Sequence, residues 1–410
     1  MRIRSVTAFA DITYPVEADA VAEMGEVLRA ARQVLQKGGY EVQTVRAAIQ
    51  PFPLALADAG GPGNAVDLAK DLEALAFVHE IDYVSLGPVR LDDPIAYIEA
   101  IPDVLAGTEK IFASIEIANR EQGISLPRVR RAADVVQRVA MLSEDGFANL
   151  RMAALANVPA WSPFFPAAYH QGDTPRVAVA TESADLVVAA VSGSATLGEA
   201  RGALTQAIEA EAGRIQSLMR QVLEPFGFAF QGIDFSLAPF PEEARSIGAA
   251  LEQLGLPAVG SQGSLLAAAF LTDALDRAQF TRTGFCGLML PVLEDNVLAE
   301  RAAEGQLDIM SLLVCSAVCG TGLDTVPLPG DVDEGALTAI LADMAALALR
   351  LDKPLTARLM PLPGKRPGDA VRFEFEYFAA SRVMAPKGAL SSGLLAGDET
   401  VALQPIRSRK

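Results

Sequence analysis

The chain has 410 residues, of which 51% are hydrophobic and 21% charged, which is far from the composition of a disordered protein. It carries 34 Lys and Arg against 51 Asp and Glu, so its formal net charge is −17. So acidic a chain repels phosphate backbones and offers no basic helix to a membrane surface, which argues against nucleic-acid and membrane partners.

The sequence predicts a cytoplasmic protein. Its three cysteines are Cys286, Cys315 and Cys319. They are too few for a disulfide framework in so long a chain and fit a reducing compartment. Asp11 and Pro15 interrupt the N-terminal segment, which therefore lacks the apolar core of a signal peptide. The uncharged stretches 152–172 and 254–272 contain prolines or glycines that would leave backbone groups unsatisfied in lipid, so we expect neither to span a membrane.

Strand and helix patterns alternate along the chain. The first part predicts strands over 3–13, 41–50, 82–88, 111–117 and 149–156, and helices over 16–37, 67–79, 93–108 and 127–142. Short apolar runs follow at 177–180 and 186–191, then a helix over 197–223, a strand over 229–237 and helices over 242–254 and 264–278. The last part predicts a strand-like run over 284–292, helix or strand over 307–318, a helix over 332–351 and strands over 356–361 and 370–378. This alternation without a linker favours a single α/β domain over 1–410, built on a parallel sheet or barrel.

Acidic residues stand at several apparent strand ends, where parallel α/β folds place their chemistry. Asp234, Glu294 and Asp324 could move protons or bind a cation there. Asp295 and Asp331 each precede a helix, so we interpret them as helix caps.

The basic candidates are Arg46, Arg358 and Lys365. A cation within an apolar strand of so acidic a protein needs a partner. That partner is either an anionic ligand or an internal carboxylate, and the sequence leaves both open.

His170 and Cys286 are the remaining candidates for catalysis. His170 follows the proline- and aromatic-rich run WSPFFPAAY, which is either a lid or pocket wall, or a rigid loop packed on a neighbouring subunit. Cys286 is either a nucleophile or a small buried apolar residue, because it lies in the apolar run GFCGLMLP. The single loose pair Cys315 and Cys319 lacks the paired spacings of a zinc site, so we predict no metal centre.

Six sequence blocks together resemble uncharacterised protein family 0210, also called domain of unknown function 711. They are TVRAAIQPF (44–52), FFPAAYHQGD (164–173), IDFSLAPFP (233–241), GFCGLMLPVLED (284–295), VCGTGLDTVPLPGD (318–331) and KPLTARLMPLPGKRPG (353–368). The family is similar in architecture to the pyruvate formate-lyase-like glycyl radical enzymes, so the resemblance implies a barrel of β-strands surrounded by helices, with a central site. It implies no particular reaction, and it leaves the cofactor unknown.

The C-terminal sequence departs from both patterns. A glycyl radical loop reads Arg-Val-x-Gly-aromatic, whereas Ala385 and Pro386 follow here, so radical chemistry is not supported. The run FEYFAASRVMAPKG (375–388) stands where the family usually has a Pro-Val-Met-Pro-like ending. This departure suggests a specialised subgroup or a lost activity.

These observations predict an enzyme, a lyase, isomerase or hydrolase, that acts on a small anionic metabolite by non-radical acid–base chemistry. The alternatives are a non-catalytic ligand-binding protein and an assembly protein. The predicted catalytic residues are His170, Asp234, Glu294, Asp324 and Cys286, and the predicted substrate-binding residues are Arg46, Ser236, Arg358 and Lys365. We also expect a homo-oligomer.

Overall fold

One large β-sheet organises the structure, a computed structural model that describes residues 1–406. Its main path runs in the order β8 (Ala229–Asp234), β7 (Arg176–Glu182), β1 (Arg2–Phe9), β2 (Val42–Ala48), β3 (Tyr83–Val89), β4 (Ile111–Asn119), β6 (Met152–Ala156), β10 (Leu355–Leu362) and β9 (Gly322–Pro329). The short strands β5 (Gly123–Ser125) and β13 (Thr400–Val401) pair beside β4, and β11 (Ala370–Val371) pairs with β12 (Ser381–Arg382) in a separate ribbon.

The strands run in two directions. Neighbours among β1, β2, β3, β4 and β6 are parallel. β7 is antiparallel to β1, and β10 is antiparallel to β6. Parallel strands need crossover connections, which helices supply here. These are α1 (Ala18–Lys37), α2 (Phe52–Ala55), α3 (Ala65–Val78), α4 (Ala96–Ala106) and α5 (Leu126–Ala140).

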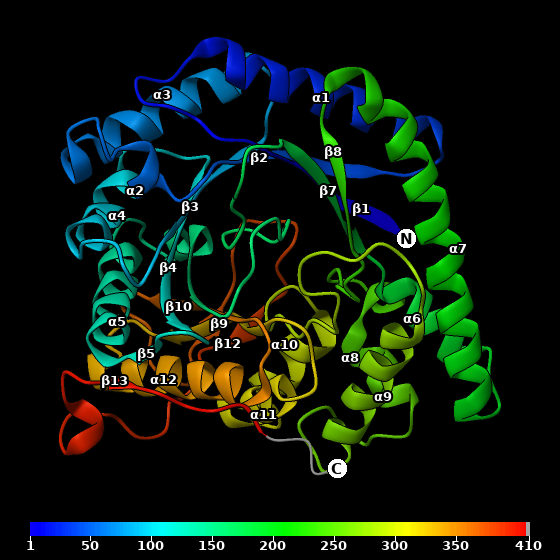
Figure 1. The fold of residues 1–410 in the computed structure, drawn as a ribbon. Helices are drawn as coiled ribbons and strands as arrows, with labels where there is room; N and C mark the ends of the chain where they lie inside the picture. Colours follow the sequence, from blue (N-terminus) through cyan, green and yellow to red (C-terminus); the bar gives the residue numbers. More distant parts are fainter. Residues whose placement is uncertain (407–410) are drawn as a thin grey trace.

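Helices cover the outer side of the curled sheet (Figure 1). The remaining ones are α6 (Ala184–Ser192), α7 (Leu197–Leu223), α8 (Ile247–Gln253), α9 (Ser264–Arg277), α10 (Asn296–Ala303), α11 (Ile309–Ser316) and α12 (Glu334–Leu351). The main hydrophobic core lies between these helices and the sheet, and it includes Ile3, Val6 and Ala8 of β1. Within residues 1–406, no helix is long and apolar enough to cross a membrane.

The segment between β6 and β7 packs against the inner side of the sheet. Its residue Phe165 joins an apolar cluster with Phe9 of β1 and Phe112 of β4. The hydroxyl of Ser85 on β3 donates a hydrogen bond to the carbonyl of Ala168, 2.7 Å away. This aromatic loop therefore fills part of the space that the sheet surrounds.

The ladder of regular strands does not close on itself within the described residues, because β8 and β9 remain its two ends. Residues 281–292 lie between these ends as irregular chain. The Leu237 amide, beyond β8, donates to the Gly287 carbonyl at 2.9 Å, and the Val292 amide donates to the Asp324 carbonyl of β9 at 3.1 Å. The structure thus supports a mixed α/β fold with a large central sheet. This description is less specific than the predicted barrel.

Most predicted elements form close to their expected positions, and α7 has the predicted bounds. Several segments differ, mostly short ones. The run 284–292 forms no regular strand, and only Ala370–Val371 of the predicted strand 370–378 is one. β9 was not predicted, because Pro327 and Pro329 disfavour a strand; they are tolerated since β9 is an end strand that pairs only with β10.

Candidate functional site

A cavity with about 870 Å³ of empty space, part of it open to solvent, lies on the inner side of the sheet. Side chains from β1, β2, β3, β4, β7, β8 and β10 line it, together with loop residues such as Phe164, Phe165 and Tyr377. Five of the predicted site residues contribute to the lining: Arg46, Asp234, Ser236, Glu294 and Arg358.

A β-bulge in β1 turns two consecutive side chains toward this cavity. Ile3 pairs with Thr181 of β7, but Ser5 pairs with the adjacent Ala180, so Arg4 is the extra residue. Ile3 and Val6 both face the outer core, while Arg4 and Ser5 both line the cavity. The bulge therefore adds an arginine to the site that simple strand alternation would place on the other face.

Arg358 lies at the centre of a buried ion-pair cluster. Its Nε donates to Asp324 Oδ1 at 2.6 Å, and its Nη2 donates to Glu294 Oε1 at 3.0 Å. Arg4 Nη2 donates to the other oxygen of Glu294. Burial disfavours the charged carboxylate, but the two arginines outweigh it and hold the pKa of Glu294 below its usual range. Glu294 thus stays ionised and fixes both guanidinium groups.

The chain is strained beside this cluster. Ala357 of β10 pairs with Leu323, and Leu359 pairs with Val326, so Asp324 and Thr325 together oppose Arg358. Thr325 has a φ of +46°, which is unusual for a β-branched residue. Burial raises the pKa of Asp324 above its usual range, although Arg358 counteracts it. Backbone strain of this kind concentrates at functional sites.

Arg46 differs from the other two cavity arginines. Within the described part of the chain it forms no ion pair with a carboxylate, and its Nε donates to Thr44 Oγ1 at 2.8 Å. Its guanidinium carbon lies 5.1 Å from the ring centre of Phe165 and 5.8 Å from that of Tyr83. Burial and repulsion from the neighbouring arginines lower its pKa to about 10, so the group remains charged at neutral pH. The half-buried guanidinium of Arg46 is therefore charged and available to form an ion pair with an anionic ligand.

Asp234 is the last residue of β8, and three donors hold its side chain in the cavity wall. The backbone amides of Phe285 and Cys286 donate to it at 3.0 and 2.9 Å, and the Ser236 hydroxyl donates at 2.5 Å. Burial nevertheless raises the pKa of Asp234, since desolvation exceeds the effect of these bonds. Gly284 makes the approach possible, because a Cβ there would lie 2.3 Å from Asp234 Oδ2. A carboxyl with a raised pKa in a cavity wall is suited to proton transfer.

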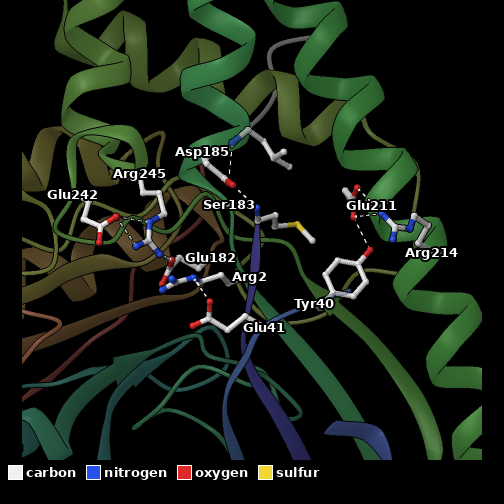
Figure 2. A network of polar contacts seen from close by, with 12 residues as sticks. Arg2, Tyr40, Glu41, Glu182, Ser183, Asp185, Glu211, Arg214, Glu242 and Arg245 are labelled. Atoms are coloured by element: carbon white, nitrogen blue, oxygen red, sulfur yellow. Dashed lines mark hydrogen bonds and ion pairs between the residues drawn. The ribbon is translucent and has the colours of Figure 1, made fainter. Parts of the chain in front are cut away.

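A polar network adjoins the cavity at the end of β7. Glu182 accepts a hydrogen bond from Gln43, a cavity-lining residue, at 2.5 Å and another from Arg245 at 3.1 Å. Figure 2 shows Arg245 between Glu182 and Glu242. Glu182 therefore ties Gln43 to the segment that precedes α8.

His170 lies outside the cavity lining. Trp161 Nε1 donates to its Nδ1 at 3.3 Å, so its Nε2 carries the proton and donates to the Gly172 carbonyl. Burial lowers the pKa of His170, which favours the neutral form. Both ring nitrogens are thus occupied within its own loop. It is the loop's Phe164 and Phe165 that line the cavity, in agreement with the pocket-wall alternative.

Three other predicted residues also lie outside the lining. Lys365 is exposed in the turn after β10, and Asp324 reaches the site only through Arg358. The thiol of Cys286 donates to the carbonyls of Ile233 and Thr283, each 3.2 Å away, and burial raises its pKa to about 12. Such a thiol is almost wholly protonated at neutral pH.

Sequence reasoning missed several lining residues, among them Arg4, Ser5, Tyr83, Phe375 and Tyr377. Arg4 is a cation in a largely apolar first strand, as Arg46 is in the second. That pattern signals the need for a partner, but it does not show on which face of the sheet Arg4 lies. Phe375 and Tyr377 gave none, because their segment reads as a strand of its own.

The fold and the cavity define a mixed α/β protein with a charged site inside a large sheet. The chain belongs to the family described as "Uncharacterised ACR (DUF711)", whose profile matches residues 1–377. A "UPF0210 protein" of Pyrobaculum arsenaticum is 39% identical over 354 residues, which cover 83% of this chain and 78% of that protein. A "UPF0210 protein" of Acetivibrio thermocellus is 29% identical over 376 residues, covering 85% and 80%. The predicted family is thereby confirmed.

Proposed function

We propose that the chain is an enzyme that binds a small anionic metabolite in the central cavity and acts on it by non-radical acid–base chemistry. The proposal rests mainly on the environment of Arg46. Its guanidinium lines the cavity without a carboxylate partner among residues 1–406, whereas Arg4 and Arg358 are both paired. An arginine in this state binds carboxylate or phosphate oxygens strongly, because the interaction is charge-assisted and partly shielded from water.

Asp234 is the proton carrier in this proposal. Its raised pKa keeps protonated and ionised forms accessible, and it lines the same cavity as Arg46. Ser236 lines the cavity too and donates to Asp234, so a proton can pass along this pair. Glu294 and Asp324 position Arg4 and Arg358 rather than exchange protons with substrate.

We propose also that the cavity wall is barrel-like. Residues 281–292 hydrogen-bond to the extension of β8 on one side and to β9 and the chain before it on the other. They would take the place of the strand that the regular ladder lacks. The contact of Gly287 with Gly320 supports this, because a Cβ on Gly287 would lie 2.3 Å from the Gly320 Cα.

The binding test compares wild type with Arg46→Met by calorimetric titration of small carboxylates and phosphates. Arg176→Met is the matched control. Like Arg46, Arg176 stacks on an aromatic ring and donates a hydrogen bond to a neutral side chain, here the amide of Gln231, but it lies outside the cavity lining. We expect wild type and the control to bind an anion that Arg46→Met binds at least tenfold more weakly. Equal binding by all three proteins would refute the role of Arg46.

The catalytic test follows an anionic metabolite mixture by mass spectrometry during incubation with the protein. We expect wild type to consume a component that Asp234→Asn still binds but leaves intact. Binding without consumption by wild type would instead favour the non-catalytic ligand-binding alternative.

A further inference from the structure

We infer that the anion is a monocarboxylate with an aromatic or other apolar body, rather than a phosphate; this rests on the proposed function above. The inference combines three features of the cavity: its charge balance, an unpartnered hydroxyl beside Arg46, and its aromatic walls.

The charge balance leaves room for at most one negative charge. Glu294 pairs with both Arg4 and Arg358, and Asp324 pairs with Arg358 as well. Two of the three arginine charges are thus offset. Asp234, the other carboxyl group of the lining, adds a negative charge when it is ionised, so within residues 1–406 at most one positive charge, that of Arg46, is left over. A dianionic phosphate would add a second negative charge beside Glu294 and Asp324, with no cation left to compensate it.

Ser5 supplies a second donor close to Arg46. Its side chain is fully buried, lines the cavity, and has no hydrogen-bond partner for its hydroxyl within residues 1–406. Ser5 pairs with Thr44 across β1 and β2, so it is a diagonal neighbour of Arg46 on the inner side of the sheet. A buried hydroxyl without a partner is costly, and one carboxylate could accept from this hydroxyl and from the guanidinium.

The walls around this donor pair are aromatic. Tyr83, Phe112 and Phe165 stack edge-to-face, with ring centres 5.2 and 5.3 Å apart, and all three line the cavity. Phe164 stands over Arg358 at 5.6 Å from the ring centre to the guanidinium carbon. Burying an aromatic or aliphatic body here removes apolar surface from water, whereas a fully polar ligand would gain nothing from these walls.

The experiment is a calorimetric titration of the full-length protein with four matched probes. Phenylacetate carries both the charge and the body, acetate lacks the body, phenylacetamide lacks the charge, and phenyl phosphate carries a second charge. A panel of further aromatic and aliphatic monocarboxylates, each with its phosphate counterpart, guards against a misfit of one ring. We expect the best monocarboxylate to bind at least tenfold more tightly than acetate, its own amide and its phosphate counterpart.

Variants assign the binding to the named groups. We expect Arg46→Met to weaken the best monocarboxylate at least tenfold and Ser5→Ala to weaken it three- to tenfold, with Arg176→Met unchanged. Tighter binding of phosphates than of monocarboxylates would overturn the inference while leaving an anion site intact. Failure of every carboxylate and phosphate to bind would overturn the proposed function together with it.

Discussion

Arg46 and Arg358 show how the same residue type can have different roles within one cavity. Arg358 is bonded by two buried carboxylates and is only 4% exposed, so its charge is satisfied within the protein. Arg46 contacts a hydroxyl and two aromatic rings, and it forms no ion pair with any carboxylate of the described residues. The first arginine belongs to the framework of the cavity, and the second is available to a ligand.

This difference predicts that the two arginines contribute unequally to stability. Arg358→Met leaves Glu294 and Asp324 buried beside each other without their shared partner, and breaking such a pair costs roughly 3–5 kcal/mol. Arg46→Met orphans no carboxylate, so we expect it to change the free energy of unfolding by less than about 1 kcal/mol. Urea denaturation of both variants measures the two values. Equal destabilisation would show that Arg46 is as structural as Arg358.

At the scale of elements, hydrophobic periodicity was sufficient for most helices and parallel strands. Their apolar faces pack against the sheet or the helix layer, so burial and pattern agree, as in α7. Periodicity fails where a strand carries an irregularity. The bulge at Arg4 moves that residue to the inner face, and the bulge opposite Arg358 sets Asp324 beside it.

The site was accordingly predictable in part. Polar residues in apolar strands need a partner, and that pattern singled out five residues that line the cavity: Arg46, Asp234, Ser236, Glu294 and Arg358. His170 lies outside the lining of this cavity, and sequence cannot show that Trp161 and Gly172 occupy both of its ring nitrogens. The ion-pair partners of the three arginines come from distant strands. Local sequence therefore cannot show which of these arginines remains without a carboxylate.

The irregular segment 281–292 makes a testable contribution through Gly284. Its φ is +66°, and a Cβ there would lie 2.3 Å from Asp234 Oδ2. Gly227 has a similar φ of +73° but nothing within 4 Å of a Cβ. Each alanine variant bears a left-handed backbone cost of roughly 1–2 kcal/mol.

We expect Gly284→Ala to lose roughly a further 1–3 kcal/mol of unfolding free energy, because it displaces a buried carboxylate from its hydrogen bonds. Chemical denaturation of the two variants gives the comparison. If Gly227→Ala loses as much unfolding free energy as Gly284→Ala, backbone conformation alone explains both losses. The close approach of residue 284 to Asp234 then contributes nothing measurable to stability.

At the scale of the whole molecule, the charge of the cavity contrasts with that of the chain. The protein has a formal net charge of −17, whereas the cavity holds three arginines, of which Arg46 is unpaired. An anion approaching from solvent is therefore repelled over a long range before it meets a local attraction. Salt weakens the first effect more than the second, because charges shielded from solvent are screened less.

Anion association should consequently become faster as salt is added. The Debye length falls from about 30 Å at 0.01 M to about 8 Å at 0.15 M ionic strength, so we expect the association rate of phenylacetate to rise roughly two- to fivefold between these conditions. The single tryptophan, Trp161, packs on the cluster that contains the cavity residue Phe165 and offers a stopped-flow fluorescence signal. The dissociation rate should change less than the association rate, since it reflects the contact with Arg46. A fall in the association rate with added salt would mean that the entrance attracts anions despite the net charge of the chain.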